Sequence, residues 1–123
     1  MDDKHYAEIS PAKGTVSAIA RADGTLLTKT TRALKLSEFN RGRAYPAVYY
    51  IPRHDVERSR LVKNEGHATR CPIKGEASYY SLKTEDGVVE NIAWSYEDPL
   101  DHVRSIKDYL GFDRKLVRIT HNP

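Results

Sequence analysis

Apolar residues in this chain fall into short runs that are typical of β-strands. Two pairs of runs are each separated by an Asp-Gly dipeptide, Asp23-Gly24 in the first pair and Asp86-Gly87 in the second. The first pair covers residues 16–20 and 25–28, and the second covers residues 77–82 and 88–94. Because glycine adopts a positive φ at no steric cost, Asp-Gly between such runs favours a tight turn. The pattern predicts two β-hairpins.

Two further strands are predicted outside the hairpins. Residues 47–51 are β-branched and aromatic, lie between Pro46 and Pro52, and have bulky side chains on both faces. This favours a central strand that is covered on both sides. Residues 116–119 form a last apolar run, whereas the charged residues 53–66 predict a connection with one helical turn.

One short helix is predicted near residues 99–108. Asp98 suits the N-cap, Pro99 the first helical position and Gly111 the C-terminal cap. The apolar positions at helical spacing are Leu100, Val103 and Ile106. The predicted fold class is therefore mainly β, a bent sheet, open barrel or sandwich with one short helix.

The length and composition limit the number of domains and suggest the cellular compartment. A chain of 123 residues fits one β-rich domain, predicted over residues 13–123, after a polar, flexible segment over residues 1–12. No apolar run approaches the length of a membrane span or of a signal peptide. The single cysteine, Cys71, has no partner for an internal disulfide, which favours a reducing, cytoplasmic setting.

The net charge of +3 says little about partners. The chain has 20 Lys and Arg residues against 17 Asp and Glu residues, and the two signs are interleaved. Arg58 and Arg60, for example, lie between Glu57 and Glu65. Nucleic-acid binding usually needs a stripe of one sign, because affinity rises with the number of neutralised phosphates. The pattern argues against nucleic acid and favours a surface of mixed charge.

The segment around Cys71 carries the strongest chemical signal. Pro72 favours an extended backbone at the cysteine, and a turn at Gly75 would bring Lys74 close to the sulfur. A nearby cation favours the nucleophilic thiolate, and His67 is a candidate base or orienting group. The alternative, without a chemical role, is that Cys71 is a small buried apolar residue, as free cysteines commonly are.

Aromatic residues on three predicted strands form a candidate ligand cleft. They are Tyr49, Tyr79, Trp94 and Tyr96. If the strands are neighbours, the rings line a cavity and their hydroxyls and indole N–H face a ligand. The alternative is ordinary core packing. Arg53 and Asp55 similarly suit either a clamp for an anionic ligand or a surface ion pair.

Several classes of site are excluded by what the sequence lacks. It contains neither a glycine-rich phosphate loop nor a G-x-S-x-G elbow. Structural zinc usually needs four closely spaced Cys or His ligands, whereas one Cys here accompanies five scattered His residues. A three-ligand site from His54, His67 and Cys71 is the remaining metal alternative. The sequence predicts neither a metal nor a cofactor.

Three segments of the chain resemble a known family. They are residues 45–56, residues 69–80 with the pattern Thr-x-Cys-Pro-x-Lys-Gly-x-Ala-x-Tyr, and residues 93–96 followed by Pro99. On these segments the chain resembles domain of unknown function family 427, over about residues 16–112. That family is catalogued under a nucleotidyltransferase-like label, but the chain lacks the paired carboxylates and phosphate loop that such transfer needs.

The resemblance implies a small fold similar to the β-tent, in which two antiparallel sheets lean together around a cleft. It also implies that residues 109–112 form a strand rather than the end of a helix. The residues at the family's motif positions, and so candidates for a shared cleft, are Tyr49, Arg53, Asp55, Cys71, Lys74, Tyr79, Trp94 and Tyr96.

The leading hypothesis is a cytoplasmic β-domain whose aromatic and cationic cleft binds a small polar or anionic molecule. Arg53 and Lys74 would supply charge, and Cys71 would lie at the base of the cleft. One alternative is a thiol-dependent enzyme with Cys71 as nucleophile, assisted by Lys74 or His67. Another is a module that presents the charged residues 53–66 to a protein or a nucleic acid.

Overall fold

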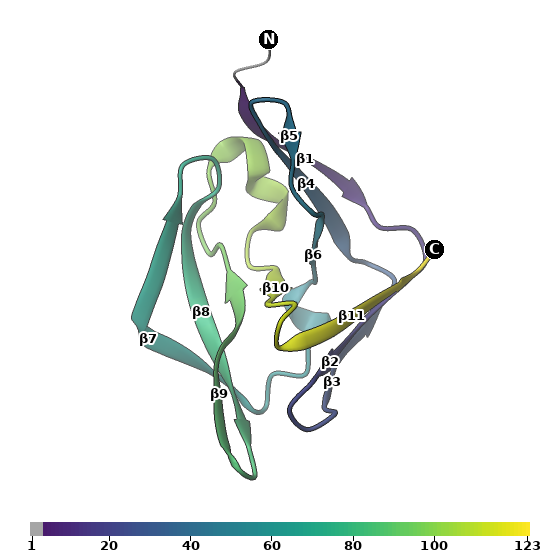
Figure 1. Cartoon of the computed structure of the whole chain (residues 1–123), viewed down its shortest axis with the longest axis vertical. Coiled ribbons are helices and arrows are strands. Elements are labelled where there is room, and N and C mark those ends of the chain that lie inside the picture. The colour runs from purple at the N-terminus through teal and green to yellow at the C-terminus, as the bar shows by residue number, and fades with distance from the viewer. Residues whose placement is uncertain (1–3) are drawn as a thin grey trace.

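The computed structural model describes residues 4–123 and shows a mainly β chain with three antiparallel sheets (Figure 1). The first contains β1 (His5–Pro11), β4 (Leu34–Asn40), β5 (Arg43–Ala44) and β6 (Val48–Tyr50). The second contains β7 (Leu61–Cys71), β8 (Gly75–Thr84), β9 (Gly87–Ser95) and β10 (Leu110–Phe112). The third contains β2 (Thr15–Ala20), β3 (Leu26–Thr30) and β11 (Val117–Asn122). The mainly β class is confirmed, with three open sheets where the resemblance implied two.

Both predicted hairpins are present. Between β2 and β3, the Gly24 amide donates to the Ala20 carbonyl at 2.9 Å, and Gly24 has a φ of +74°. Between β8 and β9, Gly87 has a φ of +139° and lies opposite Thr84 in the register. Glycine adopts these backbone angles without a side-chain clash, so local chemistry accounts for both turns.

β6 joins two of the sheets and lies near the middle of the molecule (Figure 1). One of its edges pairs with β4. Directly after it, Ile51 and Leu110 exchange backbone hydrogen bonds of 2.9 and 2.8 Å, which connects the first sheet to β10. Tyr50 and Ile51 are both buried. β6 therefore lies between the first sheet and β10, but the predicted cover on both faces is incomplete, because Val48 and Tyr49 are only partly buried.

Two groups of buried side chains fill the space between the sheets. Alternation along β2 turns Val16, Ala18 and Ala20 inward, toward the larger group. The other large members of that group are Leu27, Ile51, Val56, Leu82, Ile92, Leu110, Phe112 and Val117. The smaller group consists of Leu36, Tyr50, Ala77, Tyr96, Val103 and Ile106. The candidate site lies beside these two groups.

The segment predicted as a helix near residues 99–108 forms a 3₁₀ helix, η2 (Asp101–Ile106). A shorter 3₁₀ turn, η1 (Arg53–Asp55), follows β6. The backbone of η2 is kinked at Val103, whose φ of −122° is not helical, and the buried side chains of the element are Val103 and Ile106. No helix among residues 4–123 has the length and hydropathy of a membrane span.

The predicted caps of this helix are wrong. Leu100 occupies the N-cap and makes no side-chain capping bond. The Asp98 carboxylate instead accepts a hydrogen bond from Arg104 at 2.7 Å. Gly111 lies inside β10, so it ends no helix, and the strand that the family resemblance implied at this place is confirmed.

Residues 5–11, which belong to the segment predicted to be flexible, form β1. This strand pairs with β4 along its whole length. The Tyr6 ring also stacks on Phe39, with the ring centroids 5.1 Å apart. These contacts order a stretch whose composition is polar. Residues 1–3 lie outside the described residues.

Residues 53–66 contain the predicted helical turn, η1, and also the beginning of a strand that the sequence did not reveal. From Leu61 onward the chain belongs to β7, which pairs with β8. Two cationic side chains of this segment form ion pairs with other parts of the protein. Arg60 pairs with Asp23 at 3.2 Å, and Lys63 pairs with Glu97 at 3.0 Å.

Candidate functional site

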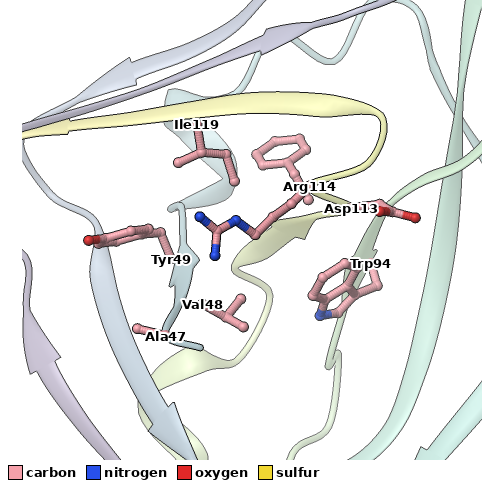
Figure 2. Close-up of a pocket in the computed structure, with 8 residues that line it drawn as sticks. Ala47, Val48, Tyr49, Trp94, Asp113, Arg114 and Ile119 are labelled. Atoms are coloured by element: carbon pink, nitrogen blue, oxygen red, sulfur yellow. The ribbon is translucent and has the colours of Figure 1, made fainter. Parts of the chain in front are cut away.

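A cavity of about 120 Å³ lies where the three sheets meet (Figure 2). Its walls come from β6 and the residue before it, from β9 and β10, from the turn after β10, and from β11. The lining residues are Ala47, Val48, Tyr49, Trp94, Phe112, Asp113, Arg114 and Ile119. Most of this surface is hydrocarbon, so the cavity suits an apolar group.

Tyr49 and Trp94 form two walls of the cavity with their rings. Their polar groups bind other parts of the protein. The Trp94 indole N–H donates to the Tyr50 hydroxyl at 3.1 Å. The Tyr49 hydroxyl lies 3.0 Å from Nδ1 of His121, and Nε2 of His121 lies 2.5 Å from the Lys13 carbonyl oxygen. Since a carbonyl only accepts, Nε2 carries a proton and donates to it, and the Tyr49 hydroxyl is bonded to Nδ1 on the other side of the ring.

Gly111 makes the position of Trp94 possible. An added Cβ at residue 111 would lie 2.9 to 3.0 Å from three atoms of the Trp94 ring. Real Cβ atoms essentially never approach other atoms this closely. The flat indole wall of the cavity therefore depends on a glycine in the neighbouring strand, where Gly111 lies directly opposite Trp94.

Arg114 places a cation over the cavity. It lies in the turn between β10 and β11, which is held by hydrogen bonds from the Leu116 and Val117 amides to the Asp113 carbonyl. The guanidinium reaches between Tyr49 and Trp94, whereas the Asp113 carboxylate points away (Figure 2). Among residues 4–123, no carboxylate pairs with this guanidinium and no side chain accepts a hydrogen bond from it.

A second polar group, buried beside the smaller core group, centres on Lys74. Its Nζ lies 2.9 Å from Oε1 of Glu38 and 5.7 Å from the centroid of the Tyr96 ring. Oε2 of Glu38 in turn lies 2.7 Å from Nε2 of His5. Burial disfavours the charged amine, but Tyr50 and Glu38 outweigh burial and raise the pKa of Lys74. Lys74 is thus held as a cation.

The pKa of Glu38 predicts a pH dependence of stability. Burial alone would raise this pKa, but hydrogen bonds from His5 and Lys74 outweigh burial and lower it. A carboxyl group with a lowered folded-state pKa stabilises the fold above its unfolded value of 4.5. That stabilisation is lost as the pH falls through the folded-state pKa. We therefore expect Glu38→Gln to flatten the fall in unfolding free energy between about pH 6 and about pH 3.5.

Urea unfolding at several pH values checks this expectation. Glu90→Gln is the matched control, because Glu90 is an exposed carboxylate on β9. It should retain the wild-type slope. An unchanged slope in Glu38→Gln would contradict the prediction.

Cys71 and Lys74 lie at the two ends of the short connection from β7 to β8. Cys71 is the last residue of β7 and lies opposite Gly75, whose φ is +108°. The electrostatic contact between Cys71 and Lys74 contributes to the raised pKa of the lysine. Cys71 is a free, partly buried thiol that packs against the smaller core group.

His67 does not lie beside Cys71. Both residues belong to β7, and four residues of extended chain span about 13 Å. The His67 ring instead packs against Tyr79, with centroids 4.5 Å apart, and the Tyr79 hydroxyl lies 2.8 Å from Oγ1 of Thr69. Among residues 4–123, no three His, Cys, Asp or Glu side chains are placed to hold a metal ion.

Arg53 and Asp55 bind separate partners and do not form a joint clamp. The Arg53 guanidinium lies 3.4 Å from Oγ of Ser95 and 5.5 Å from the Tyr80 ring centroid. Asp55 accepts a hydrogen bond from Thr30 and forms an ion pair with Arg32. Hydrogen bonds from Arg32 and Thr30 lower the pKa of Asp55.

The structure therefore places the predicted site residues in different parts of the molecule. Tyr49 and Trp94 line the cavity. Cys71, Lys74 and Tyr96 share the second polar group, and the burial of Tyr96 raises the pKa of its hydroxyl. Arg53, Asp55 and His67 lie outside both groups, whereas Tyr79 packs against the smaller core group, which contains Tyr96. A common cleft containing all of them is not formed.

Two contributors to these sites were missed in the sequence. Arg114 occurs in the short charged string Asp113-Arg114-Lys115, which is typical of any exposed turn. Tyr50 was assigned to the central strand without a chemical role. In the structure it connects the two sites, because it accepts the Trp94 hydrogen bond and influences the pKa of Lys74. Neither role has a signal in local sequence.

Comparison with known proteins adds a family but no activity. No curated protein is similar enough to the chain to count as a match. One family model, described as a domain of unknown function (DUF427), matches residues 8–122, which is nearly the whole chain. That span contains both sites described above, and on this match the chain belongs to the DUF427 family.

Proposed function

We propose that this protein binds a small anionic molecule in the cavity between its three sheets. The observation that carries the proposal is the Arg114 guanidinium, which reaches over an aromatic-lined cavity without a carboxylate partner among residues 4–123. Charge-assisted hydrogen bonds from a guanidinium to an anion are about twice as strong as neutral ones. An anion over the cavity would supply the partner that the protein does not.

The size of the cavity sets the expected affinity. A ligand that fits about 120 Å³ has few atoms inside the protein. For about ten non-hydrogen atoms at roughly −0.5 kcal/mol each, the dissociation constant is about 0.1 to 1 mM. Ligand-observed NMR is suited to this range, because weakly bound molecules exchange quickly.

Saturation-transfer NMR with a panel of small anions tests the proposal. The panel contains succinate and benzoate, each at about 1 mM, because the C–H protons of both can report binding. We expect at least one anion to give a transfer signal that Arg114→Ala abolishes and Lys115→Ala retains. Lys115 is a matched control, since it is an exposed neighbouring cation that does not line the cavity. Absence of any signal, or an equal signal in Arg114→Ala, would contradict the proposal.

A second candidate function is thiol chemistry at Cys71, which the adjacent Lys74 cation favours. A cation beside a cysteine stabilises the thiolate that reacts. Both candidates suit a reducing, cytoplasmic setting, in which the Cys71 thiol stays free.

Alkylation of Cys71 by iodoacetamide under native conditions tests the second candidate. We expect the wild type to react several-fold faster than Lys74→Met, because the variant lacks the cation. Mass spectrometry gives the rates. Partial unfolding of the variant would accelerate labelling, so it does not mimic the expected result. Equal or faster labelling of Lys74→Met under conditions in which chemical denaturation shows the variant to be folded would remove this candidate.

A further inference from the structure

The polar groups around the cavity restrict what it accepts. The Trp94 N–H is bonded to Tyr50, and the Tyr49 hydroxyl is bonded to His121. The Asp113 carboxylate points away from the cavity and accepts a hydrogen bond from the Lys115 amide at 2.9 Å. Of the lining side chains, the guanidinium of Arg114 is therefore the one that offers hydrogen bonds to a ligand.

From this arrangement we infer that the ligand is a small monocarboxylate with an apolar body about the size of one six-membered ring. The inference rests on the proposed function and narrows it. A carboxylate is planar and singly charged, which matches the two parallel N–H groups of a guanidinium. The ligand is thus apolar at one end and anionic at the other, whereas the sequence suggested a polar molecule.

The volume limits the body of the ligand. An apolar protein cavity of about 150 Å³ holds benzene. The cavity here, at about 120 Å³, is slightly smaller, and Arg114 is an exposed residue of its lining. One ring, or a branched aliphatic group of equal size, fits it. A fused bicyclic body or a nucleoside is too large.

The walls limit the polarity of the body. Ala47, Val48, Phe112 and Ile119 present hydrocarbon to the cavity. A hydroxyl group on the body would lose its hydrogen bonds to water and find no free partner there. We expect such a substituent to weaken binding at least about tenfold. The same argument predicts that a neutral analogue, which leaves Arg114 unpaired, also binds at least about tenfold more weakly.

The single tryptophan provides a direct readout of the cavity. The chain contains one Trp, so the ¹H–¹⁵N spectrum has one indole N–H resonance, which belongs to a cavity wall. We propose titrating the protein with benzoate, 3,4,5-trihydroxybenzoate, benzyl alcohol, 2-naphthoate and inorganic phosphate. Benzoate should shift the Trp94 resonance saturably, and each other probe should bind at least about tenfold more weakly.

Two variants assign the carboxylate to Arg114. Arg114→Gln should weaken benzoate at least about tenfold and leave benzyl alcohol unchanged, whereas Lys115→Gln should change neither. Both residues are exposed in a turn, and thermal unfolding verifies that both variants fold.

The outcomes separate this inference from the proposed function. Should phosphate or trihydroxybenzoate shift Trp94 at least as tightly as benzoate, and depend on Arg114, the inference is overturned while anion binding stands. Tighter binding of 2-naphthoate than of benzoate also overturns it, through the size argument. If no probe in the panel shifts Trp94, both the inference and the proposed function are wrong.

Discussion

Lys74→Met is expected to lower the free energy of unfolding by about 3 kcal/mol, because it removes the cation of a largely buried ion pair and leaves the Glu38 carboxylate with His5 alone. The side chains of Lys74 and Glu38 are 11% and 19% exposed, and their charged atoms lie 2.9 Å apart. Methionine keeps most of the hydrocarbon stem, so the loss reports the charge rather than packing. Chemical denaturation at neutral pH measures it.

The double variant Lys74→Met/Glu38→Gln is the control. Removing both charges leaves no uncompensated carboxylate, so the double variant should be more stable than Lys74→Met alone. Strict additivity of the two single effects would contradict a direct interaction. A loss below about 0.5 kcal/mol in Lys74→Met would mean that the pair behaves as an exposed one.

Gly111→Ala is expected to destabilise the protein by about 2 kcal/mol and to disturb the cavity. The added methyl would lie 2.9 to 3.0 Å from atoms of the Trp94 ring, so the ring or the strand must move. Movement of the ring would also strain its hydrogen bond to Tyr50. Thermal unfolding measures the loss, and the indole resonance of Trp94 should shift even without a ligand.

Gly66→Ala is the matched control for this substitution. Gly66 also lies in a strand, and its nearest atom to an added Cβ is Oδ1 of Asn64 at 3.7 Å, an ordinary contact. We expect a change within about 0.5 kcal/mol there. If both alanine variants have the same stability, the close approach of Gly111 to Trp94 has no energetic consequence.

The parts of the fold that sequence predicts well are those fixed by local chemistry. The two Asp-Gly hairpins need only a residue that accepts positive φ between two strand-like runs. The type of the short helix was misjudged, because apolar residues at spacing three suit both α and 3₁₀ geometry. β7 escaped prediction for another reason. Its residues are almost all exposed, so it lacks the alternating apolar pattern of a half-buried strand.

The candidate site was predictable only in part. Aromatic strand residues suggested a cleft, and Tyr49 and Trp94 do form its walls. Their polar groups were expected to face a ligand, but the Tyr49 hydroxyl binds His121 and the Trp94 N–H binds Tyr50. Such pairings join residues 44 and 72 positions apart in the chain. They depend on how the sheets meet, which no local pattern encodes.

β7 lies at the edge of its sheet, and this position gives its many charged side chains a role other than ligand binding. β7 is the last strand of its sheet, and an outer strand exposes backbone groups on which another molecule can add a strand. Charged side chains at Lys63, Glu65 and Arg70, together with the irregular register between Lys63 and Ala68, oppose such growth. The charges that make residues 61–66 look like part of a connection are therefore also charges that oppose pairing of this edge strand with a second chain.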